Sequence, residues 1–273
     1  MLQFHISDFR IAFDADFPIT AGDSWMRFAD CSPVPPDFTY RCFLSPRLPE
    51  LPENSCTRRY FDSVKGSFYA ITREVSHCEM QLFLSEENLP WGLTVDQIFT
   101  QLAITHVLLK KSRLLLHAAY ILTEQGAILF TAPSGTGKST QAQLWETHKN
   151  ARIINGDRAV AGLKNGVPTA YGFPLSGSSP CCLNRSAPLR AIVSLKQAPH
   201  NSVRILRGMQ AVSVLMNGTA LPPEYQDDLP KTVDAAIGLA ERAPILELSC
   251  RPDTDAVLVL ENALMQIENG GAE

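Results

Sequence analysis

Residues 132–139 form a short glycine-containing motif with a lysine and two serines, a combination suited to binding a phosphate group. They read APSGTGKS and match the Walker A phosphate-binding pattern G-x-x-x-x-G-K-[ST], except that alanine stands first. The first position mainly has to be small where a strand turns into the loop, so alanine is acceptable there. Gly135 and Gly137 allow backbone amides to point at an anion. Lys138 supplies a cation for the β- and γ-phosphates, and the Ser139 hydroxyl suits Mg²⁺.

The sequence around this loop predicts a strand before it and a helix after it. The apolar run AILFTA enters the loop, and a helix from Lys138 to about Lys149 would aim its N-terminal dipole at the phosphates. We therefore predict a nucleotide site for ATP and Mg²⁺, with GTP, ADP and pyrophosphate as open alternatives for the phosphate donor. Its expected binding residues are Pro133, Ser134, Gly135, Thr136, Gly137, Lys138, Ser139 and Thr140. The alternative is a glycine-rich turn without a ligand, or a P-loop that has lost its function.

Phosphoryl transfer also needs a carboxylate, either to hold Mg²⁺ or to take a proton from the attacking group. Asp157 follows an apolar run and lies 19 positions after Lys138, the length of one helix and a return strand. We expect it at the carboxyl edge of a strand next to the P-loop strand, where ligands bind in such sheets. There it would act as a catalytic residue and, with Ser139, as a metal ligand. The alternative for Asp157 is an acid in an exposed turn after the strand. Arg158, the next residue, could clamp a phosphate or be a solvated side chain.

The order LHAAYI…GAILFTAPSGTGKSTQAQLWE…IINGDRAV resembles the superfamily of HPr kinase/phosphorylase and phosphoenolpyruvate carboxykinase, over about a third of the chain. In those families a His-bearing strand precedes the P-loop, and an Asp-Asp pair follows its helix. The resemblance implies that Lys138 binds phosphates, Ser139 holds Mg²⁺ and Asp157 acts as base toward an acceptor hydroxyl. It also gives His117 an active-site role, whereas its apolar strand alone favours a core histidine.

Two departures from the family pattern limit what the resemblance implies. Arg158 replaces the second Asp, which argues against two-metal chemistry of the carboxykinase kind, and YGFPLSGSSP replaces the glutamate- and arginine-containing signature of true HPr kinases. The chain is thus similar to diverged relatives that phosphorylate serine in peptides, such as those of lasso-peptide clusters, or free serine. The loop Gly172–Ser179 could line an acceptor pocket or form a surface turn, and Arg190 could stabilise the transferred phosphoryl or be structural.

We therefore interpret the chain as a kinase, an ATP-dependent phosphotransferase that uses Mg²⁺. The expected acceptor is a hydroxyl, with serine of a peptide, a protein or a small molecule as the leading class. Three alternatives stay open: a nucleotide hydrolase or switch, a non-catalytic nucleotide-binding sensor, and a carboxykinase-like enzyme acting on a small acid.

The mixture of strands and helices predicted around the P-loop indicates an α/β fold for this part of the chain, and α+β for the chain as a whole. Residues 1–93 contain alternating runs such as TYRCFLS and EMQLFLS and predict a small antiparallel β domain, a candidate for substrate or partner recognition by strand addition. Residues 94–273 predict an HPr kinase-like P-loop domain with a mixed sheet, and 94–112 a linking helix with Thr94 as N-cap.

Within the P-loop domain the predicted strands are 114–123, 127–131, ARII, VPTAYGF, LRAIVSLKQ and ILELSC. The predicted helices are 138–149, MQAVSVLM, KTVDAAIGLAER and TDAVLVLENALMQ.

Composition excludes several classes of function. The net charge is −4 and the pI about 5.9, without the basic stripe of a nucleic-acid binder. No apolar run is long enough to predict a membrane span, and the N-terminus lacks the basic start of a signal peptide. Seven cysteines without a C-x-x-C pair indicate reduced thiols, which is typical of a cytoplasmic protein. Homo-oligomerisation stays open, since no heptad pattern decides it.

Overall fold

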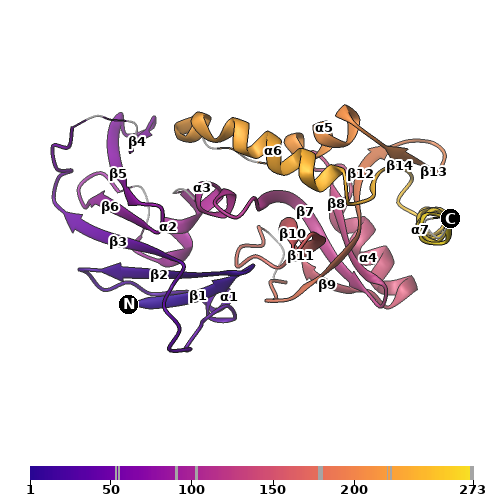
Figure 1. Cartoon of the computed structure of the whole chain (residues 1–273), viewed down its shortest axis with the longest axis horizontal. Coiled ribbons are helices and arrows are strands. Elements are labelled where there is room, and N and C mark those ends of the chain that lie inside the picture. The colour runs from indigo at the N-terminus through magenta and orange to yellow at the C-terminus, as the bar shows by residue number, and fades with distance from the viewer. Residues whose placement is uncertain are drawn as a thin grey trace. The chain divides into compact units, whose positions relative to one another are not determined.

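A computed structural model describes residues 1–52, 54, 56–89, 92–101, 104–177, 181–219, 221 and 223–270. Contacts divide the chain into two compact units, each built on its own sheet (Figure 1). The first unit contains Met1–Ile104 and Pro222–Gln226, and the second contains Thr105–Leu221 and Asp227–Glu273. The first unit therefore extends beyond residue 93, and it includes a segment from late in the sequence.

The first unit has a six-stranded sheet in the order β1-β2-β3-β6-β5-β4. Its strands are β1 (Leu2–Ile6), β2 (Phe9–Ala15), β3 (Phe38–Ser45), β4 (Thr57–Asp62), β5 (Ser67–Ser76) and β6 (Glu79–Ser85). The expectation of a mostly antiparallel sheet holds for the pairs β1–β2, β4–β5 and β5–β6, but β2–β3 and β3–β6 are parallel. A parallel pair needs a long crossover. Residues 16–37, with the short helix α1 (Asp23–Met26), supply one of the two, and β4 with β5 supply the other.

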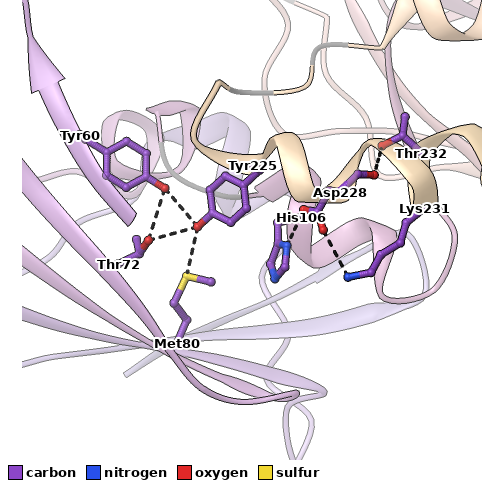
Figure 2. A network of polar contacts seen from close by, with 8 residues as sticks. All are labelled: Tyr60, Thr72, Met80, His106, Tyr225, Asp228, Lys231 and Thr232. Atoms are coloured by element: carbon purple, nitrogen blue, oxygen red, sulfur yellow. Dashed lines mark hydrogen bonds and ion pairs between the residues drawn. The ribbon is translucent and has the colours of Figure 1, made fainter. Parts of the chain in front are cut away.

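The segment Pro222–Gln226 contributes a buried tyrosine to the core of the first unit (Figure 2). The Tyr225 hydroxyl lies 3.1 Å from both the Tyr60 hydroxyl and the Thr72 hydroxyl, and it also contacts the sulfur of Met80 at 3.9 Å. Only 3% of Tyr225 is exposed, so these bonds satisfy a hydroxyl that has left water. The first unit is therefore complete only with this late segment.

The second unit has an eight-stranded mixed sheet in the order β11-β10-β7-β8-β12-β14-β13, with β9 paired to β7 (Figure 1). Its strands are β7 (Leu114–Thr123), β8 (Gly126–Thr131), β9 (Arg152–Asn155), β10 (Arg158–Lys164), β11 (Val167–Tyr171), β12 (Ser186–Gln197), β13 (Ser202–Leu206) and β14 (Ile245–Cys250). Its helices are α3 (Ile104–Leu109, whose first residue belongs to the first unit), α4 (Lys138–Lys149), α5 (Met209–Gly218), α6 (Leu229–Ala240) and α7 (Thr254–Gly270). A 3₁₀ segment, η1 (Pro223–Asp228), precedes α6.

Both faces of this sheet carry a hydrophobic core. Leu116, Leu129 and Ile192 pack with residues of α5 and α6 on one face. Ile128 and Phe130 pack with residues of α4 and α7 on the other. Strands of a sheet that is buried on both faces have nearly continuous apolar sequences. β8 fits this pattern, because it is buried along its whole length.

Secondary structure departs from the sequence prediction at two kinds of place. The linking helix 94–112 is two helices, α2 (Val95–Gln101) and α3, although the Gln97 amide does donate to the Thr94 hydroxyl at 3.3 Å, as an N-cap requires. Leu102, part of the predicted helical pattern, lies outside the described residues.

Strands β10 and β13 were not predicted. β10 and β11 form a hairpin around Asn165-Gly166, both at positive φ.

A buried ion pair lies near the point where the second unit resumes after residue 226 (Figure 2). His106 Nδ1 lies 2.5 Å from Asp228 Oδ2, and Lys231 Nζ lies 3.3 Å from Asp228 Oδ1. The Thr232 hydroxyl donates to the backbone carbonyl of Asp228 at 2.9 Å. The start of α6 is thereby fixed to α3 within the second unit.

All seven cysteines are free, and the adjacent pair Cys181 and Cys182 bonds to different carbonyls, those of Ile153 and Phe173. Among the described residues no helix combines the length and the apolar character needed to cross a bilayer.

Candidate functional site

The loop between β8 and α4 has the backbone geometry of a phosphate cradle. Gly135 has φ of 79°, and Gly137, the N-cap of α4, has φ of 119°. A Cβ at either position would meet no atom within 4 Å, so positive φ, and not crowding, requires glycine here. The first N–H groups of α4 have no acceptor within the helix and are available to an anion.

Lys138 is the buried cation of this loop, with only 7% of the residue exposed. Its ammonium donates to the carbonyls of Ala132 at 2.9 Å and Pro133 at 3.4 Å. Burial lowers the pKa of Lys138, and the negative charge of Asp157 opposes that shift. The ammonium is therefore held at the loop entrance by backbone carbonyls and attracted by the carboxylate that the sequence singles out.

One cavity of about 250 Å³ gathers most of the predicted site residues. It is lined by His117, Ser134, Gly135, Gly137, Lys138, Ser139, Thr140, Gly156, Asp157 and Ser176. Two predicted binding residues line neighbouring cavities instead. Pro133 lines one of about 380 Å³, and Thr136 lines one of about 420 Å³.

The carboxylate of Asp157 has a histidine and an arginine as neighbours. Its Oδ1 lies 3.0 Å from His117 Nε2, and its Oδ2 lies 3.5 Å from Arg158 Nε. The backbone carbonyl of Asp157 also accepts a bond from Ala118 N at 2.9 Å. The side chains of Asp157 and His117 are 27% and 42% exposed, so both are open to a reactant. His117 therefore lines the candidate cavity and is not buried in the core.

The strand order corrects one expectation about Asp157. The residue follows β9, which pairs with β7 and not with the P-loop strand β8, so the strand of His117 lies between them. β9 and β8 are both antiparallel to β7 and hence parallel to each other. Their carboxyl ends meet at one edge of the sheet, which brings Asp157 to the P-loop across an intervening strand.

Asn155 holds this arrangement together, and the sequence analysis did not single it out. Its Oδ1 accepts bonds from the amides of Asp157 and Arg158, both at 2.9 Å. Its Nδ2 donates to the carbonyls of Phe173 and Leu175, also at 2.9 Å. The side chain is fully buried. One amide thus fixes both the turn of Asp157 and the loop after β11. Asparagine two residues before a turn acid is a recognisable side chain-to-backbone turn signal.

The loop after β11 closes the cavity beside Asp157. A Cβ on Gly177, which has φ of 56°, would lie 2.8 Å from the Asp157 carboxyl carbon and from Oδ2. A Cβ on Gly172 would lie 1.9 Å from the Leu183 carbonyl, so this position admits only glycine. Ser176 of the same loop lines the cavity. Ser178 and Ser179 of the predicted acceptor loop lie outside the described residues.

The cavity of about 420 Å³ lies on another side of the P-loop. It shares Gly135, Gly137 and Thr140 with the smaller cavity and extends to β12, β14 and Pro252. Its wall includes Gln141 and Cys250, whose side chains are bonded to each other at 3.4 Å. The P-loop therefore separates a larger pocket from the small one that holds Asp157.

Arg190 and Trp145 belong to the scaffold and not to the site. Arg190 forms a bidentate pair with Glu268 of α7, at 2.7 and 3.2 Å, which leaves a phosphoryl-stabilising role without support. Trp145 is 1% exposed and packs in the core, as its helical spacing predicts.

Ser139 and Asp157 fit a nucleotide-bound Mg²⁺, because a hydroxyl and a carboxylate oxygen line one cavity with the P-loop. Mg²⁺ in such sites takes one or two protein ligands and completes its shell with waters and phosphates. Across the described ranges, no cluster of three or more His, Cys, Asp or Glu side chains could hold a metal by itself.

Comparisons with known proteins add little to this geometry. No family model and no curated protein matches the sequence. Among solved structures, the chain is similar to the Hpr(Ser) kinase/phosphatase from Coxiella burnetii, with a TM-score of 0.35 and 9% identity. The match covers 56% of this chain and 98% of that one. A TM-score of 0.35 does not establish a shared fold.

Proposed function

We propose that the second unit is a kinase that transfers the γ-phosphoryl group of ATP, bound with Mg²⁺, to a hydroxyl group. The observation that carries the proposal is the single cavity lined by Lys138, Ser139, His117 and Asp157. Donor positioning, charge stabilisation and a proton acceptor are what phosphoryl transfer requires of a protein.

The donor would bind through the P-loop. Backbone amides of Gly135 and Gly137 and the N-terminus of α4 would donate hydrogen bonds to the phosphates, and Lys138 would offset the charge that builds on the transferred group. Ser139 and Asp157 would hold Mg²⁺, which supplies further positive charge to the phosphates when bound. The cavity of about 420 Å³ beside the loop would hold the nucleoside.

The acceptor hydroxyl would be activated by Asp157. His117, 3.0 Å from the carboxylate, orients it and can share the proton that the hydroxyl releases. A serine of a peptide, a protein or a small molecule is the acceptor class that the sequence resemblance supports. The loop at Ser176 forms the wall beside Asp157 and would shape the acceptor pocket.

We also propose that the first unit recognises the acceptor. Its sheet has β4 as an open edge strand, to which an extended peptide can add as another strand. The outer edge of β1 is already bonded to residues 28–30. Phe61 of β4 is 52% exposed and packs edge-on against Phe68. A peptide array that the wild type and a Phe61→Ser variant phosphorylate equally would contradict this role for β4.

A second candidate is a nucleotide-binding sensor or a simple nucleotide hydrolase. One contact favours it: Arg158 Nε lies 3.5 Å from the carboxylate that should serve as base. Acceptor dependence separates the two functions. Phosphate release from ATP should be slow in water alone, and label from [γ-³²P]ATP should move to serine peptides. Fast release that peptides do not change would identify a hydrolase instead.

A further inference from the structure

The wall of the catalytic cavity contains a serine of the protein itself. Ser176 is half-buried and lines the same cavity as Lys138, Ser139 and Asp157. The proposed reaction moves a phosphoryl group to a serine hydroxyl in this cavity. A resident hydroxyl at that place is a potential acceptor, whatever external acceptor the protein also uses.

Both chain neighbours of Ser176 are fixed to the catalytic turn. The carbonyl of Leu175 accepts a bond at 2.9 Å from Asn155, the residue that also fixes the amide of Asp157. On the other side, a Cβ on Gly177 would lie 2.8 Å from the Asp157 carboxyl carbon, so the backbone there touches the carboxylate. Ser176 is therefore held beside Asp157 by its own loop, as a substrate serine would have to be.

We propose that Ser176 is phosphorylated by the active site of its own chain, an inference that rests on the proposed kinase function. The Ser176 oxygen attacks the γ-phosphorus of ATP and forms the new P–O bond. The bond between the γ-phosphorus and the β–γ bridging oxygen breaks, and ADP leaves with its electron pair. The hydroxyl proton passes to the Asp157 carboxylate. Holding both reactants in one cavity replaces a bimolecular encounter with a first-order step.

Phosphoserine at this position would act back on the site. It adds a charge of about −1.5 to −2 and three acceptor oxygens to a cavity whose cation is Lys138. These oxygens would compete with nucleotide phosphates for the ammonium and for the N-terminus of α4. The modified chain should accordingly bind ATP less tightly than the unmodified chain.

The test uses the full chain, treated with phosphatase, repurified, and incubated with ATP and Mg²⁺ in the absence of any other acceptor. We expect the intact mass to increase by one phosphoryl group, at a rate that does not depend on protein concentration. Fragmentation of the tryptic peptide that ends at Arg185 should place the group on Ser176. Ser176→Ala should lose the increase, Ser176→Thr should restore it as phosphothreonine, and Lys138→Ala should abolish it. Thermal unfolding confirms that each variant is folded.

Nucleotide calorimetry on the same samples separates the possible failures. ATP binding that depends on Lys138, without any increase in mass, overturns self-phosphorylation and leaves the kinase proposal standing. Phosphate on another residue, or a rate proportional to protein concentration, also overturns it. Absence of nucleotide binding overturns both proposals.

Discussion

Replacing Asn155 with aspartate tests whether one buried amide holds the turn of Asp157 and the loop of Ser176 together. The substitution keeps the size of the side chain and the oxygen that accepts bonds from the amides of Asp157 and Arg158. It removes the NH₂ group that donates to the carbonyls of Phe173 and Leu175. Only the bonds to the loop are lost, so the variant separates the loop from the turn.

The expected loss of stability follows from those two carbonyls. A buried acceptor left without a donor costs about 1–3 kcal/mol, so two cost about 2–6 kcal/mol. A carboxylate facing two carbonyl oxygens adds to this, and total stability is only about 5–15 kcal/mol. We therefore expect Asn155→Asp either to unfold at much lower urea concentration or to release the loop into water. Turnover falls in both cases, because Asp157 loses the wall of its pocket.

The pH dependence has a definite sign. Burial and the neighbouring carbonyl oxygens raise the pKa of the introduced carboxyl, whose protonated form can donate one bond to the loop. The deficit in stability should therefore be smallest at low pH and should grow as the pH rises through that raised pKa.

Urea unfolding across a pH series measures both effects, with Asn217→Asp as the matched control. Asn217 is exposed on α5, and among the described residues its side chain makes no hydrogen bond. The control should change stability by no more than about 0.5 kcal/mol. If Asn155→Asp matched the control in stability and kept its turnover, the clamp would be refuted.

Three further perturbations test separate parts of the account. Asp157→Asn should lower kcat by about 10²–10⁴-fold while calorimetry still shows ATP binding, because the P-loop is intact; unchanged kcat would remove Asp157 as the base. Gly177→Ala should lower both turnover and melting temperature, since φ of 56° costs a side chain about 1–2 kcal/mol and the new methyl would meet Asp157. Gly66→Ala is the control, because Gly66 also has a positive φ, of 66°, but an added Cβ would meet no atom within 4 Å. This variant should lower the melting temperature without lowering turnover. Asp228→Asn should cost about 3–5 kcal/mol in urea by breaking the buried pair with His106. Burial raises the pKa of Asp228, but bonds from His106 and Lys231 outweigh it and lower the pKa below the usual 3.8. The stabilisation by this carboxylate is thus complete above pH 3.8 and is lost as the pH falls through the lower pKa of Asp228 in the folded state. The free energy of unfolding should therefore fall more steeply in acid for the wild type than for Asp228→Asn. Equal slopes would contradict the assignment.

Local patterns predicted the parts of the fold that depend on local chemistry. β7 and α4 have the predicted bounds, because an apolar run and a glycine-rich N-terminus define them within a few residues. Gly135 and Gly137 have the positive φ that the phosphate pattern requires. Trp145 is in the core because its spacing places it on the buried face of α4.

Long-range pairing explains what the sequence did not predict. The parallel pairs of the first sheet, and the placement of β7 between β8 and β9, depend on which strands meet after long connections. β10 could have been found from the Asn165-Gly166 turn, whose residues both have positive φ. The role of Asn155 could not be predicted locally, because its partners Phe173 and Leu175 lie beyond the next hairpin.

We propose that the P-loop, with alanine in its first position, binds nucleotide phosphates through Lys138. Titration calorimetry of ATP with Mg²⁺ on the wild type and on Lys138→Ala tests it most directly. A hydrogen bond to a charged group is worth about 1.5–3 kcal/mol, so we predict that Lys138→Ala weakens binding by at least about tenfold. Equal affinity of the two proteins, or no binding by the wild type to any nucleoside triphosphate, would contradict the account.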